Sequence, residues 1–282
     1  MILVTGSSGL VGREVASRLA GRAPVRLALR DPAHGEEAGG AERVRFDFGD
    51  PKTFDAALHG VSRVFLLRPP QLARPRRDFG PFVAAMRLAG VGQVVFLSVR
   101  GAARNPLLPH HGIETLLEAS GLPWTHLRPN DFMQNFATVH RADIRGRGRG
   151  EIWAPAGRGR TSFVDARDVA EAAARTLTEP GHEGLAYTLT GGEVFGLAEV
   201  AALLSEALGR PVAYRNPGIP AFLRHNRAAG RPLAFGLVMT GVYTAARLGL
   251  AAEVTPDLAR LLGRPPTALR SFIQDYKKVW QG

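Results

Sequence analysis

The chain has 282 residues, no cysteine, and 36 lysines and arginines against 25 aspartates and glutamates, for a net charge of +11. The lack of cysteine excludes a disulfide framework and a thiolate zinc site, and we predict no metal site. No apolar run reaches the ~20 residues of a membrane helix, and the glycines and serines that follow the first apolar residues do not resemble a signal peptide. We therefore expect a cytoplasmic protein with no membrane association.

The positive charge favours anionic ligands. Its densest part is a glycine-interleaved segment that contains Arg145, Arg147, Arg149, Arg158 and Arg160. A surface that binds nucleic acid usually alternates such charges with aromatic residues that stack on bases, and none are present here. We therefore interpret the segment as a solvated loop and expect no nucleic-acid partner.

Short apolar runs alternate with helix-like spacing through the first half of the chain. The runs that predict strands lie at 1–5, 25–29, 44–46, 61–67, 91–97 and 124–127. The segments with helical spacing lie at 10–20, 79–89 and 113–119. This alternation is typical of an α/β fold with a doubly wound parallel sheet.

The pattern changes after residue 130. A short helical stretch at 132–139 precedes the arginine segment, and strand and helix signals then return at 161–177, 185–189 and 197–208. The remainder is helical and interrupted by prolines. We predict a first domain over 1–130, completed by about 161–190. A smaller, mostly helical C-terminal lobe over 131–160 and 191–282 would bind the substrate or act as a lid.

A glycine-rich loop joins the first predicted strand to the first predicted helix. Its residues are Gly6, Ser7, Ser8, Gly9, Leu10, Val11 and Gly12. Gly6 would make the turn, Gly9 would let a phosphate approach the backbone, and Gly12 would let the helix pack closely. Free amides and the helix dipole favour a pyrophosphate at such a position. The loop therefore predicts a Rossmann-type domain that binds a dinucleotide.

The end of the second strand distinguishes NADP from NAD, because arginine suits the extra phosphate and an acid suits the ribose hydroxyls. The chain offers Arg30 and Asp31 there. Arg30 continues the strand, and Ser7 could bind the same phosphate, so we favour NADP(H) over NAD(H). Asp47 and Phe48 close the third strand, where an adenine ring would rest; the alternative is a simple turn.

Ligands of open α/β sheets gather beyond the carboxyl ends of the strands. The residues expected at these ends are Leu67, Arg68, Ser98, His110 and Pro129. No Tyr-x-x-x-Lys pair occurs in the chain, so the proton donor of ordinary short-chain dehydrogenases is missing.

Several segments resemble the NmrA-like family of atypical short-chain dehydrogenases/reductases. They are 4–12, 95–98, 110–114, 119–125 and 127–136, and the segment 181–187 resembles the bacterial quinone oxidoreductases of that group. The resemblance implies NAD(P)H binding. It does not decide the activity, because the family contains both reductases and cofactor-sensing regulators.

Reductases of this family often have a lysine where this chain has His110. We predict that His110 and Asn135 are catalytic, with His110 donating a proton at neutral pH; the alternative for His110 is an exposed residue that opens a helix. Arg68 could also stabilise the anion of a reduced quinone.

The favoured function is hydride transfer from NADPH to a small quinone-like or aromatic acceptor. Phe132, Met133 and Phe136 would form an apolar wall for this acceptor, or else pack in the core. The rival hypothesis is a non-catalytic NADP(H) sensor that acts on a protein partner through the apolar segment 235–250. The sequence leaves undecided whether the chain forms a homo-oligomer.

Overall fold

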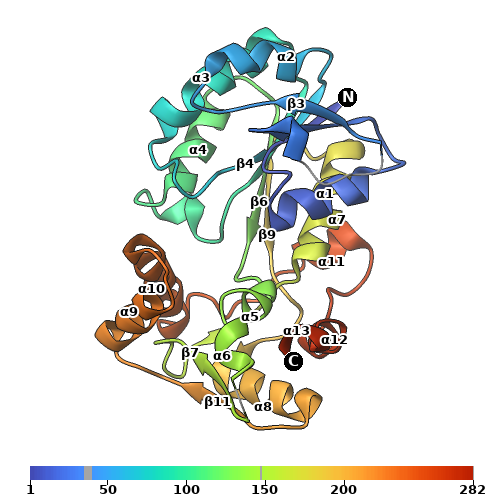
Figure 1. Cartoon of the computed structure of the whole chain (residues 1–282). Coiled ribbons are helices and arrows are strands. Elements are labelled where there is room, and N and C mark those ends of the chain that lie inside the picture. Colours follow the sequence, from blue (N-terminus) through green and yellow to red (C-terminus); the bar gives the residue numbers. More distant parts are fainter. Residues whose placement is uncertain (35–39, 147, 282) are drawn as a thin grey trace. The chain divides into compact units, whose positions relative to one another are not determined.

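The computed structural model describes residues 1–34, 40–146 and 148–281, and the chain divides into two compact units. The first, here called the Rossmann unit, contains Met1–Pro129, Ala166–Leu189 and Asp257–Arg264. The second, here called the lobe, contains Asn130–Asp165, Thr190–Pro256 and Pro265–Gly282. Figure 1 shows both units, with the chain coloured from the N-terminus to the C-terminus.

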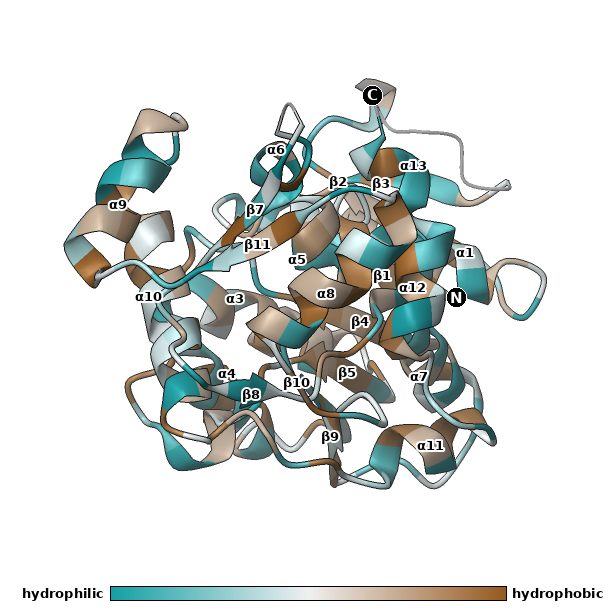
Figure 2. Ribbon diagram, turned by 90° about the horizontal axis from the view of Figure 1, so that it is seen from below, coloured by the Kyte–Doolittle hydropathy of each residue, from teal (hydrophilic) through white to brown (hydrophobic). Residues whose placement is uncertain are grey.

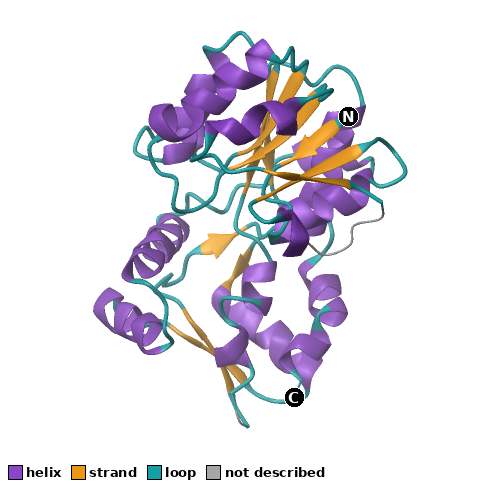
Figure 3. Ribbon diagram, turned by 45° about the horizontal axis from the view of Figure 1, so that its top comes forward, coloured by secondary structure: helices purple, strands orange, loops and turns teal. Residues whose placement is uncertain are grey.

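A parallel seven-stranded sheet in the order β3-β2-β1-β4-β5-β6-β9 forms the centre of the Rossmann unit (Figure 3). Its strands are β1 (Ile2–Val4), β2 (Val25–Leu29), β3 (Glu42–Arg45), β4 (Arg63–Leu67), β5 (Gln93–Leu97), β6 (Trp124–Pro129) and β9 (Leu185–Leu189). The order reverses between β1 and β4, which makes this pair the switch point where ligands of open sheets bind.

Helices cover both faces of this sheet (Figure 1). One face carries α1 (Leu10–Leu19), α7 (Ala166–Thr178) and α11 (Asp257–Leu262), and the other carries α2 (Phe54–Leu58), α3 (Pro75–Leu88) and α4 (Pro109–Glu118). Three short 3₁₀ helices lie in the loops, at Pro32–His34, Pro51–Thr53 and Ala102–Arg104. The doubly wound sheet predicted from the sequence is confirmed.

The core beneath α2 and α3 is rich in phenylalanine. Phe46, Phe54, Phe79 and Phe82 are almost fully buried, and Phe48 packs against them with its ring 4.8 Å from that of Phe46 and 4.9 Å from that of Phe79. Burial of such large side chains stabilises a fold by ~1.5–3 kcal/mol each. This cluster therefore fixes the third strand and the helices that follow it.

The lobe has its own core and two short strand pairs. The parallel pair is β7 (Gly150–Trp153) with β11 (Val212–Arg215), and the antiparallel pair is β8 (Arg160–Thr161) with β10 (Phe195–Gly196). The helices are α5 (Gln134–Ala137), α6 (Arg141–Ile144), α8 (Leu197–Leu208), α9 (Ile219–Ala228), α10 (Leu233–Arg247), α12 (Leu269–Asp275) and α13 (Lys277–Trp280). Figure 2 shows apolar residues along α8, β11 and α12, which together enclose the lobe's core.

Several features of the chain differ from the sequence expectations. Helix α2 was not predicted, because five residues are too short for a periodic signal. Residues 161–165 lie in the lobe, although they were expected to complete the first domain. Asp257–Arg264 belongs to the Rossmann unit instead of the lobe, because α11 buries its leucines against α7.

The segment that contains the arginines is a solvated loop only in part, because Gly150–Trp153 forms β7 and Ile152, Ala154 and Ala156 are buried. Arg145, Arg149, Arg158 and Arg160 are exposed, and Arg160 pairs with Glu199 at 3.0 Å. Arg147 lies outside the described residues. Among the described helices, none has the length and apolar character that a membrane crossing requires.

Candidate functional site

The glycine loop follows β1 and is packed too tightly for side chains at two positions. Gly6 has φ +64°, a left-handed conformation that favours glycine. A Cβ at Gly12 would lie 2.2 Å from the carbonyl oxygen of Gly6 and 3.0 Å from the Cα of Ser7. Helix α1 can therefore begin directly against the turn only because position 12 has no side chain.

The N-terminus of α1 leaves three backbone donors available. The amide of Gly9 donates to the Gly6 carbonyl at 2.9 Å and closes the turn before the helix. The next three amides, of Leu10, Val11 and Gly12, have no acceptor among the described residues. No acidic side chain lies in this first turn, so the positive end of the helix dipole is not neutralised. The arrangement suits a diphosphate.

The residues predicted to select the cofactor have different environments. Arg30 is exposed at the end of β2, while the side chain of Asp31 accepts a hydrogen bond from the Ala33 amide at 3.0 Å and shapes the turn. Ser7 is buried, and its hydroxyl donates to the Ala28 carbonyl at 3.2 Å, which anchors the loop to β2. Arg30 is therefore the side chain with freedom to meet a phosphate.

The residues expected to border the adenine have local roles. Asp47 accepts from the Gly49 amide at 2.8 Å, which shapes the turn after β3. Phe48 is half-buried in the phenylalanine cluster and keeps part of its ring at the surface. Both residues lie beyond the carboxyl end of β3, as the sequence indicated.

Leu67 is the last residue of β4, the strand next to β1, and Arg68 follows it. The Leu67 side chain packs on the glycine loop, 3.0 Å from where a Cβ of Gly6 would be. The Arg68 Nη1 donates to the carbonyls of Pro69, Pro70 and Leu72 at 2.9–3.2 Å, and its Nε donates to His110 Nε2 at 3.3 Å. The structure thus brings together two predicted site residues, Arg68 from the loop after β4 and His110 from the first turn of α4.

His110 lies in the first turn of α4 with its ring stacked on Phe96 at 6.1 Å between centroids. Burial, followed by the positive charge of Arg68, lowers the pKa of His110 to about 4. The ring is therefore neutral at pH 7. This corrects the prediction that His110 donates a proton at neutral pH.

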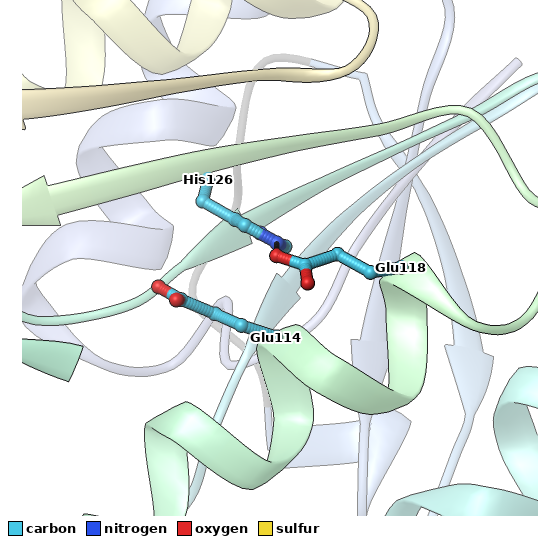
Figure 4. Close-up of side chains that lie close together, drawn as sticks. All are labelled: Glu114, Glu118 and His126. Atoms are coloured by element: carbon cyan, nitrogen blue, oxygen red, sulfur yellow. Dashed lines mark hydrogen bonds and ion pairs between the residues drawn. The ribbon is translucent and has the colours of Figure 1, made fainter. Parts of the chain in front are cut away.

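An ion pair between Glu114 of α4 and Arg128 of β6 joins this helix to the sheet. Burial raises the pKa of Glu114, but hydrogen bonds from Arg128 at 2.8 and 2.9 Å outweigh it, and the net pKa is lowered. Figure 4 shows Glu114 and Glu118 on α4 beside His126 on β6, with ligand atoms within 4.8 Å of one another. Arg128 neutralises Glu114, and His126 Nε2 lies 3.2 Å from Glu118, so each of these groups has a partner within the protein.

Ser98 directly follows β5 and Pro129 ends β6, and both are buried. The lobe begins with the next residues. There, Asn135 Nδ2 donates to the carboxylate of Asp131 at 2.5 Å, and burial raises the pKa of Asp131 to about 6. Asp131 carried no signal in the sequence that distinguished it from an ordinary loop acid.

The predicted apolar wall is only partly available. Met133 and Phe136 are each 2% exposed and belong to the core of the lobe, where the Phe136 carbonyl accepts from Trp280 Nε1 at 2.9 Å. They cannot line an open pocket, and the alternative of core packing is correct for them. Phe132 is half-exposed and stays a candidate.

The parallel sheet, its switch point and the open helix N-terminus define a Rossmann-type dinucleotide-binding protein. The chain belongs to the NmrA-like family, which it matches over residues 1–231. The resemblance found in the sequence is therefore confirmed.

Relatives and solved structures match almost the whole chain. An NAD(P)H azoreductase of Xenophilus azovorans is 34% identical, over 96% of both chains. A (4-alkanoyl-5-oxo-2,5-dihydrofuran-3-yl)methyl phosphate reductase of Streptomyces griseus is 36% identical, over 99% of both. The crystal structure of an NADPH-dependent quinone oxidoreductase of Escherichia coli with NADPH has a TM-score of 0.89 at 27% identity, covering 98% of this chain and all of the other.

Proposed function

We propose that this chain is an NADPH-dependent oxidoreductase that reduces a small quinone-like or aromatic acceptor. The relatives support this class, since one is named as an azoreductase and a solved neighbour as a quinone oxidoreductase. A third relative reduces a dihydrofuranone phosphate, so the acceptor could also be a conjugated non-aromatic carbonyl compound.

The observation on which the proposal rests is the unpaired first turn of α1 at the switch point of the sheet. Amides of Leu10, Val11 and Gly12 would bind the pyrophosphate, with Gly6 and Gly9 giving it access to the backbone. Arg30 would bind the additional phosphate of NADP(H). Bound NADPH supplies the hydride.

The remaining predicted contacts follow the carboxyl edge of the sheet. Around the bound cofactor we expect Ser7, Ser8, Asp47, Phe48, Leu67, Arg68, Ser98 and Pro129. In the lobe, Phe132 and Asn135 are the candidates to meet the acceptor. The Asn135 amide already donates to Asp131, so its second hydrogen is the one available for a ligand.

The test is to titrate the protein with NADPH and NADH by fluorescence and to follow oxidation of NADPH with a panel of quinones and azo compounds. We expect tighter binding of NADPH and turnover with at least one acceptor. Binding without turnover across the panel would favour the sensor hypothesis. Absence of binding by both nucleotides would remove both hypotheses.

The proposal includes the location of the protein and its partner. A cytoplasmic location fits a chain without cysteine and dependent on NADPH, and a small-molecule acceptor is the expected partner. Fractionation of cells against a cytoplasmic marker tests the location.

A further inference from the structure

The guanidinium of Arg68 is fixed by several hydrogen bonds to its own loop. Its Nη1 donates to three carbonyls, at 3.2 Å to Pro69, 3.0 Å to Pro70 and 2.9 Å to Leu72. With one end of the guanidinium fixed in this way, the Nε–H has a defined direction. It is directed at His110 Nε2, 3.3 Å away.

This contact determines where the hydrogen of the His110 ring lies. A guanidinium can only donate, so His110 Nε2 must accept and cannot carry a hydrogen itself. In a neutral ring the hydrogen is then on Nδ1. His110 Nδ1 has no partner among the described residues and is not one of their buried unpaired atoms, so it reaches solvent.

The other neighbours keep the ring in this state. Phe96 lies against it, at 6.1 Å between ring centroids, and supplies no charge. The charged groups that act on the ring are Arg68 from the loop after β4 and Glu114 from the next turn of α4. Glu114 is already paired with Arg128, so it stabilises a protonated His110 ring less than an unpaired carboxylate would.

We propose that Arg68 is a positioning residue that holds His110 as a neutral ring with its hydrogen on Nδ1, so that His110 acts as a fixed hydrogen-bond donor to the reduced acceptor. This inference rests on the proposed function for its last part only. The contact between Arg68 and His110 exists whatever the chain reduces.

The chemistry balances without a proton from His110. A hydride, with its two electrons, forms a new bond to the quinone and leaves the hydroquinone monoanion, while NADPH becomes NADP⁺. The Nδ1–H would stabilise the negative oxygen by a hydrogen bond and keep its hydrogen. Water then supplies the single proton that completes the hydroquinone.

The first test uses ¹⁵N-detected NMR of the histidine rings and needs neither cofactor nor acceptor. In the parent protein we expect the signals of a neutral His110 ring with its hydrogen on Nδ1, from pH 8 to below pH 5. These signals are assigned by their loss in His110→Gln. In Arg68→Leu we expect titration at higher pH, toward the ordinary 6.5, and a population of the Nε2–H form. Arg74→Leu removes an exposed charge from the same loop and should leave the ring unchanged.

The second test separates donation of a hydrogen bond from donation of a proton. His110→Asn retains an N–H donor, and His110→Leu does not. We expect kcat with a quinone to fall ~10- to 100-fold in His110→Leu and several-fold less in His110→Asn, with the NADPH Kd unchanged in both. The kcat of the parent should not change between pH 6 and 8 through titration of His110.

An Nε2–H ring in the parent, or titration near 6.5 regardless of Arg68, would overturn the positioning role. Equal losses in His110→Asn and His110→Leu would overturn the donor role. If the proposed function fails, NADPH is either not bound or not oxidised by any acceptor of the panel, but the NMR result still decides the positioning role of Arg68.

Discussion

Replacement of Gly12 by alanine is the sharpest test of the candidate cofactor site. The new Cβ would lie 2.2 Å from the Gly6 carbonyl oxygen and 2.6 Å from its carbon. Ordinary contacts to a Cβ begin near ~3.4 Å, so the helix and the turn must separate by about 1 Å, and both neighbours are backbone that cannot rotate away. Overpacking of this kind costs ~1–3 kcal/mol.

We expect the melting temperature of Gly12→Ala to fall by about 2–12 °C, from ~2–4 °C per kcal/mol for a chain of this size. The NADPH Kd should rise by at least ~10-fold, because the same movement displaces the amides of α1. Circular dichroism and a fluorescence titration measure the two quantities.

Gly80→Ala is the matched control. Gly80 lies inside α3, and no atom lies within 4 Å of its Cβ position. Alanine should stabilise this helix by ~0.5–1 kcal/mol and leave NADPH binding unchanged. If Gly12→Ala has the melting temperature of the control and the NADPH Kd of the parent protein, the close packing is not required for binding.

Three further predictions concern charged groups. Arg30→Ala should weaken NADPH binding ~10- to 100-fold and NADH binding little. The control, Arg87→Ala on α3, should change the binding of neither nucleotide. Equal losses for the two nucleotides would show that Arg30 does not bind the additional phosphate. Glu114→Gln should lower the free energy of unfolding by ~1.5–3 kcal/mol at pH 7, because it removes the charge that neutralises Arg128 and one of the two hydrogen bonds between them. The difference should shrink as the pH falls through the lowered pKa of Glu114, and urea unfolding at pH 7 and pH 4 tests this. His140 is buried against Tyr243 Oη at 2.8 Å, and burial, then the charges of Arg231 and His225, lower its pKa to about 3. The unfolded chain therefore binds a proton that the native chain excludes, so stability should fall from pH 6.5 toward pH 3 by up to ~1.4 kcal/mol per pH unit, and an unchanged slope in His140→Phe would refute this assignment.

Local patterns predicted the elements well where one segment contains the whole signal. The strand expected at 25–29 and the helix expected at 197–208 have those bounds as β2 and α8. The first is a short buried run between turns, and the second is an amphipathic helix that ends at Gly209 in a left-handed conformation.

The sequence was less informative where a residue depends on distant neighbours. Nothing in the spacing of Met133 and Phe136 distinguishes a pocket wall from a core, and both lie in the core. The attachment of α11 to α7 depends on a chain return that no local pattern signals. The contact of Arg68 with His110 joins a loop and a helix whose residues are 42 positions apart, and its effect on the histidine pKa depends on the folded geometry.

The chain passes between its two units five times, at residues 129/130, 165/166, 189/190, 256/257 and 264/265. No single cut therefore releases either unit whole. A fragment that ends at residue 130 would lack β9 at the edge of the sheet, and it would lack α7, which packs against α1. The surface that the buried alanines of α7 cover would then be exposed to solvent. Exchange of the lobe between homologous proteins would require replacing three inserted segments together, so acceptor preference in such chains should change by substitution within the lobe more readily than by recombination.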